Sequence, residues 1–345
     1  MENDADILIA GAGPAGLACA LGLLGRGVKF RIAERRTESA PRVFRRGLIL
    51  RPRTLAMLEE FGLAEPLIAE GQKLSLLKVE EDGRVLARFD LSAIKSPTPF
   101  LLCIPEEGVI SVFTSAICAR GGTIERGLAV TNVRVEPDGR TKVHFSDGSD
   151  AYYTHVVGAD GLNSAVRMAL GIPFTGYDYP GGWFFADEYA EADPHSGVLT
   201  LLPGGGMRLN LPLGGGQVRS VSTVNFDDAV NLPVAIRQVQ GAVRAGVRLT
   251  GTAAAAHGPF GGIGMSREIE DALSLARSIA QEPESAEVSA EINSEAATLE
   301  LAETVFRGGR IKNRAGRFFR AYVLFLCARV PSFRRRVLRA LTGLA

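Results

Sequence analysis

The sequence predicts an α/β protein in which a doubly wound, Rossmann-like nucleotide-binding domain carries an inserted mixed β-sheet and ends in a helical C-terminal region. Three observations predict this class. An apolar strand near the N-terminus runs into a glycine-rich loop and an apolar helix, a second apolar strand near residue 156 ends in an Asp-Gly turn, and a third glycine-rich loop precedes a helix near residue 265. Forty of the 345 residues are glycine, above the usual share of about 7%.

Composition and charge exclude several classes of protein. A hydrophobic content of 46% with 22% charged residues is typical of a globular chain and not of a disordered or fibrous one. The 39 Lys and Arg residues balance 38 Asp and Glu residues, so no overall field attracts nucleic acid, and we expect no nucleic-acid partner. The four cysteines form no Cys-x-x-Cys pair and the histidines lack ligand spacing, so no metal site is predicted.

The first unit consists of a strand (6–10), a loop, a helix (17–24) and a second strand (28–33). In its loop, Gly11 makes the tight turn, Gly13 lets the backbone approach a pyrophosphate, and Gly16 lets helix and strand pack closely. The helix N-terminus offers N–H groups to the anion. Glu34, about 20 residues after Gly13, stands where an acid accepts hydrogen bonds from an adenosine ribose. A loop with only a packing role is the alternative.

Two further motifs favour the same kind of site. The predicted strand 154–158 delivers Asp160 to the carboxyl edge of a sheet, and Ser164 is placed to cap a short helix. An Asp-Gly turn without a ligand is the alternative for Asp160. The loop from 248 to 265 opens a predicted helix over 267–280, which presents another helix N-terminus behind glycines.

These motifs, in this order, resemble the FAD-dependent aromatic hydroxylases, the single-component flavoprotein monooxygenases of the para-hydroxybenzoate hydroxylase type. The resemblance covers most of the chain. Besides the first unit, it rests on the following segments: 46–48 with 52–55 and 62–63, 158–167, 176–180 with Trp183, 259–262 with Gly264 and Met265, and Asp271 with Ala272. It implies that Arg46 meets the FAD, that Asp160 serves FAD and transient NADPH binding, and that backbone N–H groups of the third loop face the flavin.

The resemblance implies one set of site residues. The expected cofactor-binding residues are Gly11, Gly13, Pro14, Ala15, Gly16, Glu34, Arg35, Arg46, Asp160, Gly251, Gly261, Gly262, Gly264 and Met265. The candidate catalytic residues are His257 and Pro259 in the flavin loop; for His257 the alternative is a half-buried loop histidine. The implied activity is hydroxylation of an aromatic or polycyclic small molecule with FAD, NAD(P)H and O2, in secondary metabolism.

Several positions depart from the family pattern. Thr252 and Ala255 stand where the family has Asp and His, Ser266 where it has Asn, and Glu106 where it has Gln. The stretch from Gly176 to the third loop is shorter than the family's, and residues 225–248 are expected to lead directly into the strand before that loop. Loss of the Asp weakens FAD binding, so two alternatives stay open: an FAD-containing cyclase or isomerase, and a non-catalytic family member.

The predicted domain organisation is discontinuous. Its parts are an FAD-binding domain (1–75, 103–172 and 248–280), a substrate domain (76–102 and 173–247) and a C-terminal helical region (281–345). Acids at the N-terminus, where a signal peptide is basic, predict a cytoplasmic protein, and the longest apolar run, 321–328, is too short to span a bilayer.

The C-terminal region has an unusual charge distribution. Residues 307–345 hold eleven basic residues and no acid, and Pro331 divides them into two predicted helices. Either this basic segment is neutralised by the acidic segment 267–306, or it lies on an anionic membrane surface. The identity of the substrate and the oligomeric state do not follow from the sequence.

Overall fold

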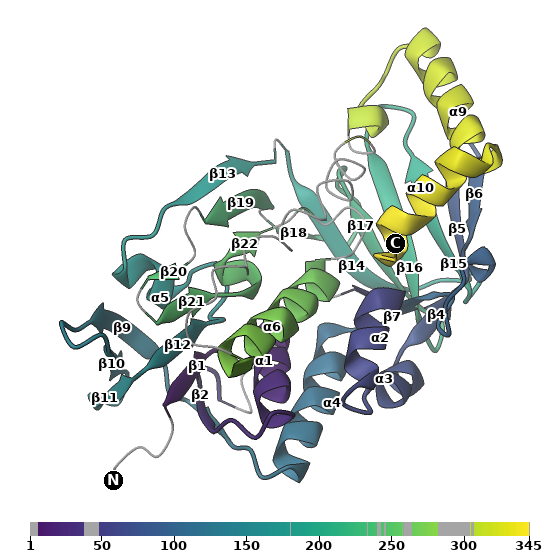
Figure 1. The fold of residues 1–345 in the computed structure, drawn as a ribbon. Coiled ribbons are helices and arrows are strands. Elements are labelled where there is room, and N and C mark those ends of the chain that lie inside the picture. Colours follow the sequence, from purple (N-terminus) through teal and green to yellow (C-terminus); the bar gives the residue numbers. More distant parts are fainter. Residues whose placement is uncertain are drawn as a thin grey trace.

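A computed structural model describes residues 6–37, 48–179, 181–232, 234–239, 243–244, 246–256, 258, 264–281, 304 and 307–344. It confirms the predicted class. A parallel sheet with helices stands beside a second, larger sheet, and two helices at the C-terminal end pack against that larger sheet (Figure 1).

The nucleotide-binding part is built on a six-stranded sheet in the order β20-β21-β12-β1-β2-β8. Its strands are β1 (Ile7–Ala10), β2 (Phe30–Glu34), β8 (Ile124–Arg126), β12 (His155–Gly158), β20 (Val243–Arg244) and β21 (Val247–Leu249). All pairs are parallel except β20 with β21. Every residue of β1 is buried, as expected for a central parallel strand that is covered on both faces.

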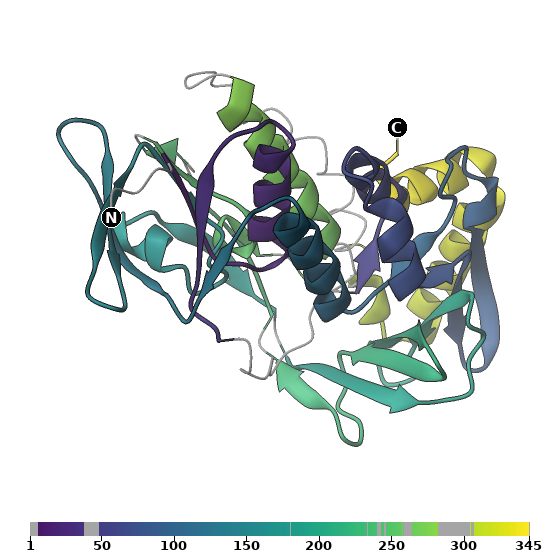
Figure 2. The same cartoon turned by 90° about the horizontal axis from the view of Figure 1, so that it is seen from below.

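Three helices cover one face of this sheet: α1 (Pro14–Leu24), α4 (Glu106–Ala119) and α6 (Gly264–Gln281). Figure 2 shows them side by side, with α1 between the other two. Their close packing depends on Gly22, where an added Cβ would lie 2.6 Å from the Cβ of Ala276. The opposite face carries the antiparallel sheet of β9 (Val130–Val135), β10 (Thr141–Phe145) and β11 (Asp150–Tyr153), together with α5 (Ala165–Ala169).

The second large sheet has seven strands in the order β18-β14-β17-β16-β15-β5-β6. Its strands are β5 (Leu76–Glu81), β6 (Arg84–Asp90), β14 (Trp183–Tyr189), β15 (Ser196–Leu201), β16 (Met207–Gly214), β17 (Gln217–Ser222) and β18 (Val230–Leu232). Only β15 and β5 pair in parallel, so the sheet is mixed as predicted. Trp183, at 2% exposure, lies in its core with Leu211 and Met207.

Smaller elements join the two sheets. They are β3 (Ile49–Leu50), α2 (Pro52–Glu59), α3 (Ala64–Glu70), β4 (Gln72–Leu74), η1 (Leu91–Ala93), β7 (Leu101–Cys103), β13 (Phe174–Asp178), β19 (Ala235–Val239), η2 (Gly251–Ala253) and β22 (Ala255–Ala256). The expectation that residues 225–248 lead directly into the strand before the third loop is wrong. β18, β19 and β20 come first, because β18 completes the edge of the large sheet and β19 bridges β13 to β22.

The C-terminal helices are α9 (Arg314–Arg329) and α10 (Pro331–Thr342). Pro331 begins α10, as its fixed φ and missing N–H favour, so the predicted division is confirmed. The helix ends at Gly343, whose φ of +69° is the left-handed conformation that glycine adopts without strain. Among the described residues, no helix is both long and apolar enough to cross a membrane.

Candidate functional site

A cavity of about 600 Å³ opens at the carboxyl ends of β1, β2 and β12, where parallel α/β sheets bind their ligands. One part of its wall comes from the glycine loop and from the ends of the neighbouring strands: Gly11, Gly13, Pro14, Ala15, Glu34, Arg35, Arg36 and Asp160. Another part comes from apolar side chains of the second large sheet and the segment after it: Phe185, Leu232, Val234 and Ala235. Thr252, Gly264, Met265, Glu268 and Glu106 complete the wall.

The three glycines of the first loop have different surroundings. Gly11 has a φ of +104°, and a Cβ there would lie 2.4 Å from the carbonyl oxygen of Ala159. A Cβ at Gly16 would lie 1.9 Å from the carbonyl oxygen of Gly11, so only glycine allows strand and helix to come this close. A Cβ at Gly13 would meet nothing within 4 Å, because this backbone faces the cavity.

The N-terminus of α1 is arranged to receive an anion. Gly13 is the N-cap residue and has no side chain with which to cap the helix, Pro14 occupies the first turn, and that turn holds no acid. The first N–H groups of the helix and the positive end of its macrodipole therefore point toward the cavity beside Gly13.

Glu34 holds the glycine loop while it lines the cavity. Its carboxylate accepts hydrogen bonds from the main-chain N–H of Ala12 at 2.7 Å and from that of Arg36 at 2.8 Å. The side chain is 8% exposed. Each carboxylate oxygen has a second lone pair, so the group retains acceptor capacity for hydroxyls of a ligand.

The two carboxylate oxygens of Asp160 have different surroundings. One carboxylate oxygen, Oδ2, accepts a hydrogen bond of 3.1 Å from the N–H of Val166. The other, Oδ1, is buried and has no hydrogen-bond partner among the described residues. Because a buried acceptor without a partner costs free energy, a donor on a bound cofactor fits this position. A ribitol or ribose hydroxyl is such a donor, so the residues present fit FAD.

Arg167 connects the Asp160 turn to the third loop. Its guanidinium donates to the carbonyl of Leu162 at 2.7 Å and to that of Ala253 at 3.0 Å. Ser164 caps α5 by accepting the N–H of Arg167 at 2.9 Å, which confirms the predicted cap. The second and third motifs therefore form one wall of the cavity.

The third motif differs from its expected form in two ways. α6 begins at Gly264, three residues earlier than predicted, because Gly264 and Met265 already belong to its first turn. Glu268, one turn further along α6, lies close to the loop: a Cβ at Gly251 would be 3.8 Å from its carboxylate oxygen Oε2. A carboxylate is thus present beside the position where Thr252 replaces the family's Asp.

Ser266 has a structural role at the start of α6. Its fully buried hydroxyl donates to the carbonyl of Ile49 at 2.9 Å and accepts from the N–H of Arg51 at 3.0 Å. Next to it, the Glu270 carboxylate accepts from the Arg51 guanidinium at 2.6 Å and from the hydroxyl of Thr54. This buried network attaches α6 to β3 and α2.

The structure brings most predicted site residues together. The ones that line this cavity are Gly11, Gly13, Pro14, Ala15, Glu34, Arg35, Asp160, Gly264 and Met265. Gly16 packs against Gly11 and Gly251 packs against Ala15, so both lie behind the residues that line the cavity. The predicted residues outside the described part of the chain are Arg46, His257, Pro259, Gly261 and Gly262.

Sequence reasoning missed Glu268 and Arg36 as cavity residues. Glu268 could have been found, since it follows Gly264 by four residues and so shares its helix face. For Phe185, the apolar strand after Gly181 and Gly182 left core packing and substrate contact as alternatives, and its place in the cavity wall depends on how the second large sheet docks. Among the described residues, no cluster of three or more His, Cys, Asp or Glu side chains could hold a metal ion.

Residues 4–203 match the family model described as "FAD binding domain". The chain belongs to this FAD-binding domain family. The glycine loop, Glu34 and Asp160 all lie within the matched segment of this FAD-binding chain.

Among curated relatives, the FAD-binding chain is 31% identical to 6-methylpretetramide 4-monooxygenase from Streptomyces rimosus; the match covers 81% of this chain and 57% of that protein. The chain spans about half the length of the curated relatives that it matches first, with shares of 57%, 41% and 41%.

Two solved structures show the same fold. The crystal structure of p-nitrophenol 4-monooxygenase PnpA from Pseudomonas putida DLL-E4 is 19% identical with a TM-score of 0.88, and the match covers 99% of both chains. The Diels-Alderase PyrE3 from pyrroindomycin biosynthesis is 22% identical with a TM-score of 0.78, and the match covers 98% of this chain and 76% of that one.

Proposed function

We propose that the protein is an FAD-dependent monooxygenase that hydroxylates an aromatic or polycyclic small molecule with NAD(P)H and O2. The observation that carries the proposal is the cavity, whose wall combines the open backbone at Gly13 and the Asp160 oxygen that has no partner among the described residues with apolar side chains of the second large sheet. The relative that acts on 6-methylpretetramide supports a polycyclic substrate.

In this proposal each part of the cavity holds one part of the cofactor. Glu34 and Arg35 receive the adenosine end, the N–H groups at the start of α1 receive the pyrophosphate, and Asp160 accepts a hydroxyl hydrogen bond. Gly264 and Met265 lie toward the flavin. The remaining assignments rest on the sequence resemblance: Arg46, Gly16, Gly251, Gly261 and Gly262 at the cofactor, with His257 and Pro259 as catalytic residues.

When bound, FAD supplies the electron transfer and oxygen insertion by which one ring C–H, O2, NAD(P)H and a proton become one C–OH, NAD(P)+ and water. The residues of the protein would bind and orient the cofactor and the substrate, and they would exclude water from the cavity. Phe185, Leu232 and Val234 offer an apolar surface on which a planar ring packs without unpaired polar groups.

The matched pair Gly13→Ala and Gly204→Ala tests the cofactor site. Both glycines have open space around a new Cβ and neither has a positive φ, so both variants are expected to fold with unchanged thermal stability. The methyl group at position 13 would occupy the space in front of the α1 N-terminus. Since hydrogen bonds to charged groups contribute about 1.5–3 kcal/mol each, we expect FAD to bind at least about tenfold more weakly.

The measurement is a flavin-fluorescence titration of each refolded apoprotein with FAD, followed by NADPH oxidation with and without a polycyclic phenol. Unchanged FAD affinity in Gly13→Ala would contradict the proposed site. NADPH oxidation that does not respond to any phenol would contradict hydroxylation while leaving the FAD site in place.

A second candidate is an FAD-containing cyclase or isomerase. The altered third motif, with Thr252 and Ala255, favours it, and so does the Diels-Alderase of the same fold. Such a protein would be yellow and indifferent to NADPH. A colourless protein that fails to bind added FAD would instead indicate the third alternative, a non-catalytic family member.

A further inference from the structure

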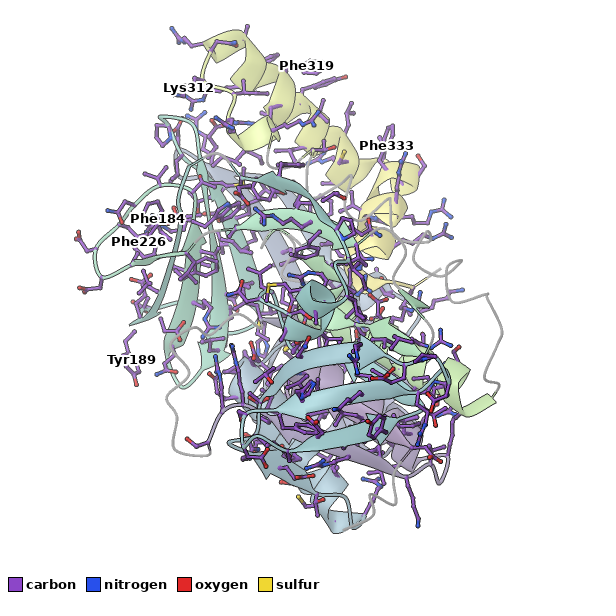
Figure 3. The ribbon with its side chains drawn as sticks, turned by 90° about the vertical axis from the view of Figure 1, so that its left-hand side faces the viewer. Phe184, Tyr189, Phe226, Lys312, Phe319 and Phe333 are labelled. Atoms are coloured by element: carbon purple, nitrogen blue, oxygen red, sulfur yellow. The ribbon has the colours of Figure 1, made fainter. Side chains whose placement is uncertain are left out.

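The outer side of the two C-terminal helices exposes an unusual number of aromatic side chains. Phe318 is 78% exposed, Phe319 65%, Tyr322 54% and Phe333 50%. Phe318, Tyr322 and Phe325 follow one another at helical spacing on α9, so they form a continuous stripe. Figure 3 shows Phe319 and Phe333 on the outer side of the helices, away from the seven-stranded sheet.

The opposite side of these helices is firmly attached to the protein, so the exposed stripe does not arise from a detached segment. Arg320 donates to the Glu81 carboxylate at 2.5 Å, and Arg317 donates to Glu81 at 2.6 Å and also to Asp82. Leu338 is 6% exposed and packs in the core of the second large sheet. The helices therefore have an inner face that is already buried and an outer face that is open.

The same two helices carry exposed cations. They are Arg314, Arg329, Arg334, Arg335, Arg336 and Arg339. Within the described part of the chain, none of them forms an ion pair with a carboxylate, and residues 307–345 contain no acid. The guanidinium of Arg329 lies 4.5 Å from the centre of the Phe325 ring, so cation and aromatic groups share one surface. This aromatic–basic face comprises the outer sides of α9 and α10.

We propose that the aromatic–basic face binds the surface of an anionic lipid bilayer. Aromatic side chains on a docked helix insert at the boundary between headgroups and acyl chains, and surrounding Lys and Arg side chains neutralise anionic headgroups. This inference is independent of the proposed function.

Charge complementarity favours a bilayer over a second copy of the chain. A two-fold dimer through this face would bring two sets of six exposed cations together, with no acid on either helix to offset them. An anionic bilayer offers both the opposite charge and an apolar layer. Nucleic acid would satisfy the charge but would leave most of the aromatic stripe in water.

The test is vesicle flotation of the full-length protein with phosphatidylcholine vesicles that contain 30% phosphatidylglycerol, and with pure phosphatidylcholine vesicles. We expect binding to the anionic vesicles that weakens as salt rises from about 0.1 to 0.5 M. The triple variant Arg334→Gln, Arg335→Gln, Arg336→Gln should lose about 100-fold in affinity, at about 1 kcal/mol per basic residue.

Two control variants separate this face from general effects. Arg134→Gln, Arg140→Gln, Lys142→Gln removes the same charge from β9–β10, on the opposite side of the molecule (Figure 1), and should bind like the wild type. Tyr189→Ser removes an aromatic side chain elsewhere that is 78% exposed, and it should leave vesicle binding unchanged. The double variant Phe318→Ser, Phe319→Ser should instead weaken vesicle binding at least tenfold.

Thermal melting of each variant checks that it folds. The substituted side chains are exposed, except that of Lys142, which is half-buried. Absence of flotation with either vesicle, equal flotation with both, or equal loss in the β9–β10 control would overturn the proposal. It would also be overturned by sedimentation that shows a concentration-dependent dimer abolished by the Phe318→Ser, Phe319→Ser variant, since the face would then be a self-association surface.

Discussion

The main-chain N–H of Ala12 donates a hydrogen bond of 2.7 Å to the carboxylate of Glu34. This contact joins the glycine loop after β1 to the end of β2, so one acid both shapes the loop and lines the cavity. The same carboxylate also accepts the N–H of Arg36. The shape of the glycine loop and the wall of the cavity therefore depend on a single residue.

Glu34→Ala is expected to weaken FAD binding by about 10- to 150-fold, since it removes a charged acceptor. It should also destabilise the fold by about 1–3 kcal/mol, because the N–H of Ala12 loses its buried partner. FAD titration and urea denaturation measure the two effects. Glu59→Ala, at an exposed acid on α2, is the matched control. A loss of stability without any change in FAD affinity would assign Glu34 a purely structural role.

Thr252→Asp is expected to tighten FAD binding by about tenfold, because it adds a charged acceptor to the cavity wall. The Glu268 carboxylate reduces this gain in affinity by like-charge repulsion, since it lies beside the neighbouring Gly251. The double variant Thr252→Asp, Glu268→Gln should therefore bind FAD more tightly than Thr252→Asp alone. If both variants bind like the wild type, the loop does not contact the cofactor. Isothermal titration with FAD distinguishes these outcomes.

Glu270→Gln is expected to destabilise the protein by about 3–5 kcal/mol. The substitution leaves the Arg51 guanidinium, whose side chain is fully buried, without its charged partner at 2.6 Å. The exposed pair Arg277–Glu60 provides the control, because Glu60→Gln should cost less than about 1 kcal/mol. Chemical denaturation of both variants tests the prediction, and equal losses would contradict it.

His155 is expected to make the protein less stable at mildly acidic pH. Burial on β12, together with the nearby Arg248 guanidinium, lowers the pKa of His155 below its ordinary value of 6.5. Between that lowered pKa and 6.5, the unfolded chain binds a proton that the folded chain does not, so stability falls as pH drops below about 6.5. The fall levels off below the folded pKa.

His155→Gln should remove this loss of stability at mildly acidic pH. The measurement is urea denaturation of both proteins at pH 5.0, 6.0 and 7.5. Parallel stability curves for the two proteins would show that His155 does not carry the pH dependence. His195 lies exposed near β15 and its replacement by Gln serves as the control.

Sequence alone determined the parts of this protein that depend on local signals. The strand–loop–helix unit at Gly11–Gly16, the acid Glu34, the turn at Asp160 with its Ser164 cap, and the helix break at Pro331 all follow from backbone rules that act within a few residues. The sequence also shows that the C-terminal segment 307–345 is rich in aromatic and basic residues.

Only the tertiary structure decided which distant segments share the cavity and which faces stay open. Glu268 reaches the loop because α6 packs against α1, and Phe185 reaches it because the second large sheet docks beside the first. The Arg51–Glu270 pair joins residues 219 positions apart in the sequence. Such contacts depend on the packing of many side chains at once, and no local pattern of residues encodes them.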